Sequence, residues 1–139
     1  MAPRTRLDKV VKVRERAEDT ALVGLVRARA QVERAQGQLS LAVEASQRDG
    51  RSCGPVELWH LEELEHRRAL QALRTAQGEV HQATQEEARA LGGYASAHRG
   101  TEVVRRVQER RRAEILGELE KRERKEIDEI ATLRFNVGH

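Results

Sequence analysis

Proline occurs only at Pro3 and Pro55, which leaves two long stretches of the chain free of the residue that interrupts helices. In the first stretch, 4–47, small and apolar residues recur three and four positions apart along one stripe: Leu7, Val10, Val13, Ala17, Ala21, Gly24, Ala28, Ala35, Leu39 and Ala42. The stretch from 56 to about 135 has the same spacing. This is the period of an α-helix and differs from the period of two that a strand requires. The chain is therefore predicted to be all-α.

A short turn separates the two predicted helices. Asp-Gly and Gly-Pro pairs fall within 48–55, which is a strong turn signal. Gly50 suits the end of the first helix, and Ser52 suits the start of the second. A short connection favours antiparallel neighbours, so we predict an antiparallel two-helix coiled-coil hairpin with a longer second helix. In this interpretation residues 1–139 form one domain, with helices over about 4–47 and about 56–135.

The second predicted helix contains glycines at Gly92, Gly93 and Gly100. Each glycine inside a helix costs about 1 kcal/mol relative to alanine, so a bend near Gly92 and Gly93 is compatible with the sequence. A complete turn there would give three helices. A continuous second helix is favoured, because no proline or Asn-Gly pair accompanies the glycines.

Composition favours long helices over a compact core. Charged residues make up 35% of the chain and aromatic residues only 2%, although aromatic side chains bury the largest areas in compact cores. Much of the apolar content is alanine, which forms helices readily but buries little area. We therefore expect a hairpin of marginal stability that gains further burial from partner proteins.

No secretory or membrane segment is recognised. Polar and basic residues follow Met1, and no run approaches the roughly 20 apolar residues that span a bilayer. Cys53 is the only cysteine, so an internal disulfide is excluded and a reducing compartment fits. We expect a soluble cytoplasmic protein without direct membrane insertion.

No catalytic, cofactor or metal site is predicted. The sequence has no glycine-rich phosphate loop and no nucleophile elbow, and its histidines and single cysteine do not have metal-ligand spacing. The protein is therefore expected to act by binding other proteins.

A basic cluster, Arg105-Arg106 and 110–112, raises the alternative of a nucleic-acid-associated or scaffolding coiled coil. Glu102, Glu109 and Glu114 interrupt the cluster, and no aromatic side chain is nearby to stack on bases. We expect a surface that faces solvent or protein and does not bind nucleic acid. A salt titration separates the two, because phosphate-driven binding weakens steeply with salt.

The unequal helix lengths predict an overhang. If the chain reverses near 49–55, Leu7 lies opposite about residue 96, and the second helix from about Thr101 has no partner. This overhang would carry an unpaired stripe: Val104, Val107, Ile115, Leu119, Ile127 and Ile130. Such a stripe invites another protein, and self-association is the alternative. Near the turn, Trp59 either anchors a partner or covers the loop.

Three segments resemble the flagellar FliJ proteins and their injectisome relatives of the YscO/SctO type. These are RLDKVVKVRER at 6–16, VRRVQERRR at 104–112 and EKRERKEIDEIA at 120–131. Loop placement, Trp59 and total length also fit. The resemblance covers nearly the whole chain, but it leaves open whether the chain serves a flagellum or an injectisome.

The resemblance implies a stalk inside the hexameric ring of an export ATPase, linked to the cytoplasmic domain of the export gate. Some family members also handle export chaperones. The end that bears both termini would contact the ring, through Arg122, Lys125, Glu126, Asp128, Glu129 and Arg134. The start of the second helix would face the gate, through Leu58, Trp59, Glu62, Glu65 and Ala69. Glu65, Ala69, Ala72 and Ala76 offer less apolar bulk there than the flagellar pattern.

Overall fold

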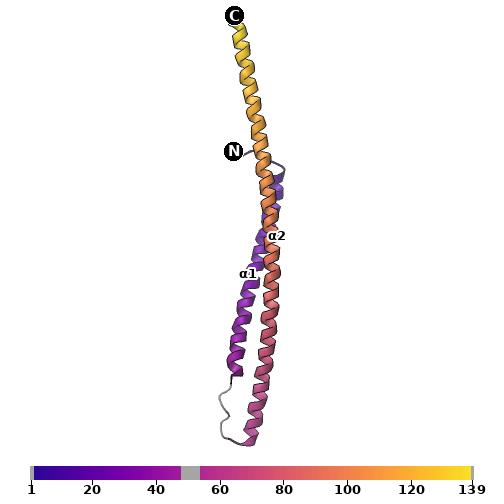
Figure 1. Cartoon of the computed structure of the whole chain (residues 1–139), viewed down its shortest axis with the longest axis vertical. Coiled ribbons are helices and arrows are strands. Elements are labelled where there is room, and N and C mark those ends of the chain that lie inside the picture. Colours follow the sequence, from indigo (N-terminus) through magenta and orange to yellow (C-terminus); the bar gives the residue numbers. More distant parts are fainter. Residues whose placement is uncertain (1, 48–53, 139) are drawn as a thin grey trace. The chain divides into compact units, whose positions relative to one another are not determined.

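Two helices account for nearly all of the chain in the computed structural model, which describes residues 2–47 and 54–138. They are α1 (Leu7–Ser46), of 40 residues, and α2 (Val56–Val137), of 82 residues (Figure 1). The described residues contain no strand. The predictions of an all-α chain and of a helical hairpin with a longer second helix are confirmed.

The start of α2 is set by its proline. Pro55 directly precedes the first helical residue, and its carbonyl accepts a hydrogen bond from the Leu58 amide at 3.1 Å. Proline suits such a position because its missing amide proton has no partner in a first helical turn. The predicted caps Gly50 and Ser52 lie outside the described residues.

The chain divides into two units, each made of antiparallel segments of α1 and α2. Unit 1 comprises Met1–Glu18 and Ser96–His139, and unit 2 comprises Asp19–Ala95. The prediction that residues 1–139 form one domain stays a prediction.

Small apolar side chains hold unit 2 together. Val32 and Ala35 of α1 are buried against Ala83 of α2, and Val80 packs on the same cluster. Leu25 and Ala76 are also buried. Positions 25 and 32, 28 and 35, 73 and 80, and 76 and 83 are each seven residues apart, which is the repeat of a coiled-coil seam. Alanine contributes little burial per layer, so this seam is a modest source of stability.

Polar side chains dominate the seam of unit 1. Thr101 is fully buried, and its hydroxyl donates to the carbonyls of Ala97 (3.0 Å) and Arg14 (3.3 Å). Gln108 is buried and donates to Asp8, and His98 contacts Glu18 at 2.8 Å. From Asp8 to Glu18 the chain advances ten residues in α1, while their partners Gln108 and His98 lie ten residues apart in the reverse direction in α2, as antiparallel helices require.

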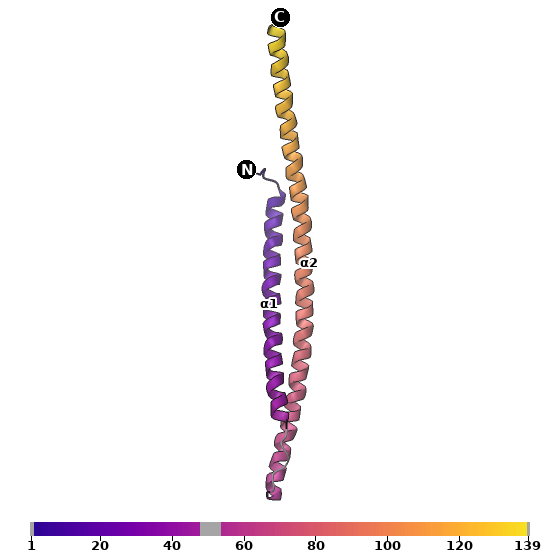
Figure 2. The same cartoon turned by 60° about the vertical axis from the view of Figure 1, so that its left-hand side comes forward.

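The predicted register of the N-terminus was wrong. Leu7 shares a groove with Val107, Arg111 and Ile115, and it does not lie opposite residue 96. The part of α2 without an α1 partner in unit 1 therefore begins after Ile115, not near Thr101. Figure 2 shows α2 continuing beyond the start of α1.

The seam of unit 2 shows why a symmetric hairpin is not formed. A reversal centred on the turn would place Val32 opposite Gln71 and Leu25 opposite Gly78. In the observed register Val32 and Ala35 meet Ala83 and Val80. The observed register has apolar contacts where the symmetric reversal would bury the Gln71 amide and Gly78. Burial of an unpaired amide is costly.

Gly92 and Gly93 do not interrupt α2, which runs through both residues. A Cβ atom built on either glycine would meet no atom within 4 Å outside the helix backbone. Neither glycine is therefore required for close packing within the structure described.

We predict that Gly92→Ala and Gly93→Ala each raise the free energy of unfolding by about 0.5–1 kcal/mol, because alanine is the better helix former. Urea unfolding followed by circular dichroism measures the change. Gly100→Ala is the matched control and should gain less, since its Cβ would lie 3.3 Å from Arg14 Nη1. Destabilisation by both substitutions at 92 and 93 would contradict this account.

Candidate partner-binding surfaces

The most exposed part of the described chain is the end of α2 in unit 1. We call residues 116–137 the C-terminal extension. No residue from 118 to 138 is buried, even partly. The extension begins where the contacts of the N-terminal segment with Val107, Arg111 and Ile115 end. A helix of this length gains little stability from propensity alone, which makes an uncovered apolar face on it informative.

An apolar stripe follows one face of the C-terminal extension. At 3.6 residues per turn its members fall within an arc of about 120°: Leu116, Leu119, Ile127, Ile130, Leu133 and Val137. Ile127 is 63% exposed and Leu133 is 64% exposed. By the same geometry, the stripe continues the α2 face that contacts α1 through Thr101, Gln108 and Arg112.

The residues predicted to contact an ATPase ring are all exposed on this extension. Arg122 and Glu129 lie along one edge of the apolar stripe. Glu126 and Arg134 fall within the stripe itself. Lys125 and Asp128 point away from the stripe by helical geometry. The helix thus brings four of the six to the stripe or its edge, and their role in binding stays a prediction.

Asp8 fixes the N-terminal segment beside the base of the extension. Its carboxylate accepts hydrogen bonds from the Gln108 amide, from Arg112 Nη2 at 3.2 Å and from the Thr5 hydroxyl at 3.0 Å. It also accepts a hydrogen bond from the Thr5 backbone amide at 3.2 Å, as in a capping box. These hydrogen bonds, with Gln108 the largest contributor and the nearby Arg112 charge a smaller one, lower the pKa of Asp8 to about 2.

Two further polar contacts join α1 to α2 in unit 1. Arg105 lies 3.1 Å from both Glu15 and Glu102, and the hydrogen bonds that it donates to these carboxylates raise its pKa. The His98 ring nitrogen lies 2.8 Å from Glu18, and this hydrogen bond lowers the pKa of Glu18. Because these groups remain accessible to water, each contact contributes little to stability.

The same contacts change the interpretation of the basic cluster. Arg105 and Arg112 pair with carboxylates of α1, and Arg111 lies 3.1 Å from Glu114. Three of the five arginines at 105, 106 and 110–112 are thus already neutralised within unit 1. A phosphate backbone needs clustered, uncompensated charge, so this surface is poorly suited to nucleic acid.

The predicted gate-facing residues lie in the first turns of α2, in unit 2. Leu58, Glu62, Glu65 and Ala69 follow at intervals of four, three and four, so they share one helix face. Trp59 is adjacent to this face and is 40% exposed. It occupies the same heptad position as Leu73 and Val80, which form the seam farther along α2. Whether it binds a partner stays a prediction.

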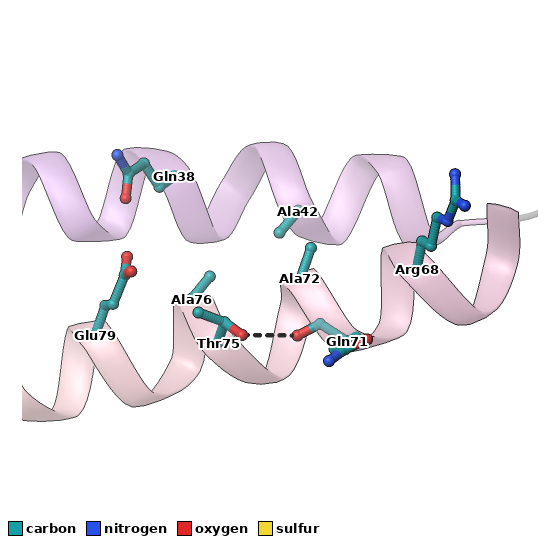
Figure 3. A pocket seen from close by; sticks show the side chains of 8 residues that line it. All are labelled: Gln38, Ala42, Arg68, Gln71, Ala72, Thr75, Ala76 and Glu79. Carbon is teal, nitrogen blue, oxygen red and sulfur yellow. Dashed lines mark hydrogen bonds between the residues drawn. The ribbon is translucent and has the colours of Figure 1, made fainter.

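A shallow groove lies between α1 and α2 in unit 2, where alanines line the seam. Figure 3 shows Ala42, Ala72 and Ala76 facing the space between the helices, with Gln38 and Glu79 at one end. The Thr75 hydroxyl donates a hydrogen bond to the Gln71 carbonyl of the same helix at 3.1 Å. The methyl groups of these three alanines do not fill the space between two helices. The groove therefore follows from the small side chains and does not require a ligand to account for it.

Comparison with known families decides the relationship of the chain. A family model described as Flagellar FliJ protein matches residues 3–138. The chain belongs to the FliJ family. This family is a non-enzymatic component of the flagellar type III export apparatus, which agrees with the function class predicted from the sequence. No curated protein and no solved structure gives a significant match.

Metal-binding clusters and membrane-spanning helices are both absent from the described residues of this FliJ-family chain. Among the described residues, no group of three histidine, cysteine, aspartate or glutamate side chains is placed to hold a metal ion. Within the same part of the chain, no helix is both long and apolar enough to cross a membrane.

One residue of the extension was missed by sequence reasoning. Glu126 was included among the predicted ring contacts, but Glu123, on the same face of α2, was not. The signal that identifies it is glutamate at every third position, 120, 123, 126 and 129.

We predict that Asp8→Asn loosens the attachment of residues 7–18 to α2 at neutral pH. The pKa of Asp8 is lowered from 3.8 to about 2, so the carboxylate stabilises the fold above pH 4, and this contribution disappears as the pH falls through 2. Amide hydrogen exchange of 7–18 measures the effect.

The difference between Asp8→Asn and the wild type should be largest near pH 6 and should vanish near pH 2. Asp19→Asn, at an exposed position of α1, is the matched control and should not change exchange in 7–18. Equal exchange in Asp8→Asn and wild type at pH 6 would show that Asp8 does not hold the segment.

Proposed function

We propose that this chain is a stalk of a type III export apparatus that binds the ring of the hexameric export ATPase through its C-terminal extension. The start of α2, around Leu58 and Trp59, would face the cytoplasmic domain of the export gate. Export chaperones are further candidate partners. In this role the protein is cytoplasmic and associates with the inner membrane through its partners.

The exposed apolar stripe of the extension is the observation that carries this proposal. Full burial of one large aliphatic side chain contributes roughly 1.5–3 kcal/mol. The stripe offers six such side chains that remain exposed in the described part of the chain. Contiguous exposed apolar surface bordered by charge is typical of a protein-binding site.

The charges beside the stripe suggest how binding would act on a ring. One helix inside a six-fold ring cannot make identical contacts with all six subunits. Arg122 and Glu129 would therefore stabilise one arrangement of the subunits over the others. Such a bias promotes ring assembly or couples hydrolysis to the gate.

The purified cognate ATPase tests the proposal. Addition of the wild-type chain should raise ATP turnover or hexamer assembly. Ile127→Ser combined with Ile130→Ser should raise the concentration of the chain needed for half-maximal stimulation at least about tenfold, because two apolar contacts are lost. Helical content measured by circular dichroism shows whether the variant still folds.

The matched control replaces exposed apolar residues elsewhere, Val23→Ser with Leu41→Ser in unit 2. It should stimulate the ATPase as the wild type does. The proposal fails if the wild type changes neither turnover nor assembly, or if the control loses as much stimulation as the stripe variant.

A further inference from the structure

Two glutamates lie inside the apolar stripe of the C-terminal extension. Positions 116, 119, 123, 126, 130, 133 and 137 are spaced alternately by three and four residues, which is the spacing of a coiled-coil seam. Five of these seven positions are apolar. The two at the centre are Glu123 and Glu126, and both are exposed.

The surroundings of Glu123 are unfavourable in the free chain, whereas Glu126 has Arg122 four positions before it. The residues three and four positions from Glu123 are Leu119, Glu120, Glu126 and Ile127, so no cation lies next to it on the helix. Glutamates at 120, 123, 126 and 129 instead form an acidic line that crosses the stripe. Like charges at this spacing destabilise a helix, and a cation supplied by a partner would remove the penalty.

A second copy of the chain supplies carboxylates at this position in two of its arrangements. In a parallel pair, Glu123 faces Glu123 and Glu126 faces Glu126 of the other copy. In the antiparallel pair that aligns Leu116 with Leu133 and Leu119 with Ile130, Glu123 meets Glu126. Both arrangements place four carboxylates in two adjacent layers, and burial of unpaired like charge is strongly unfavourable.

We propose that the stripe docks a partner helix that carries lysine or arginine opposite Glu123 and Glu126, between apolar residues at either end. The same two glutamates disfavour self-association of the extension in these two arrangements, which is specificity by repulsion of the wrong partner. This inference rests on the proposed function only in taking the partner helix to belong to the export apparatus.

Two synthetic helical peptides test the choice of partner on the full-length chain. Both carry leucine opposite the apolar positions of the stripe, and they differ only in lysine or glutamate at the two central layers. Fluorescence anisotropy should show the lysine peptide binding the wild type at least about tenfold more tightly. Glu123→Lys with Glu126→Lys should reverse the preference.

The matched control, Glu118→Lys with Asp128→Lys, makes the same change of charge away from the stripe and should keep the wild-type preference. Equal binding of the two peptides to the wild type would overturn the proposal. A preference that the control variant alters as much as the stripe variant would overturn it as well.

Sedimentation equilibrium tests whether the two glutamates disfavour a second copy. Glu123→Leu with Glu126→Leu completes the stripe and should associate at least about tenfold more tightly than the wild type. Glu118→Leu with Asp128→Leu should not. A wild type that associates as tightly as the completed stripe would refute this effect.

The peptide and sedimentation measurements contain no ATPase. Their failure is therefore distinguishable from failure of ATPase stimulation, which tests the proposed function alone.

Discussion

The pairing of α1 with α2 in unit 2 depends on a seam of small side chains, in which Leu25 and Val32 are buried together with alanines of both helices. In unit 2 this requirement selects the register in which Val32 and Ala35 meet Ala83 and Val80. A symmetric reversal would bring Gln71 and Gly78 into the seam instead. The register thus follows from side-chain volume and polarity, and the position of the turn does not determine it.

The two units are stabilised by different interactions. Unit 2 buries aliphatic and alanine side chains, whereas unit 1 buries Val11 and otherwise relies on hydrogen bonds and ion pairs around Asp8, Thr101 and Arg105. Polar contacts that remain accessible to water contribute less than buried apolar area. Residues 7–18 are therefore held less firmly than residues 25–35, and they adjoin the base of the uncovered C-terminal extension.

Exposure of the extension gives the chain its capacity to bind. The stripe of aliphatic side chains supplies burial, and the charged residues at its edge and centre restrict which surfaces can cover it. Membership of the FliJ family identifies the chain as a component of the flagellar type III export apparatus. The description of the surface in terms of burial and charge does not depend on that membership.

Much of the fold was predictable from the sequence. The spacing of apolar residues and the absence of proline predicted two helices, and continuity through Gly92 and Gly93 followed from the lack of other turn signals. The register was not predictable from the turn, because it depends on which residues of the two helices fit together. Ten small or aliphatic residues along one stripe do not distinguish one seven-residue shift from another.

The candidate site was predictable only in part. The charged residues Arg122 and Glu129 were identified by resemblance, and the structure places them along one edge of the stripe. Glu123 was missed because it looks like an ordinary solvent-facing charge until the face of α2 is known. The contacts of Asp8 with Gln108 and Arg112 were missed because they join residues about a hundred positions apart.

Hydrogen exchange along α2 of the free chain tests most directly whether the extension is uncovered. Helical amides without tertiary packing open locally and exchange fast, whereas amides beside a packed seam are protected. The account predicts rapid exchange throughout 116–137 and the slowest exchange near Ala76 and Ala83. Protection of 116–137 equal to that of the Ala83 region, in a monomeric chain, would contradict it.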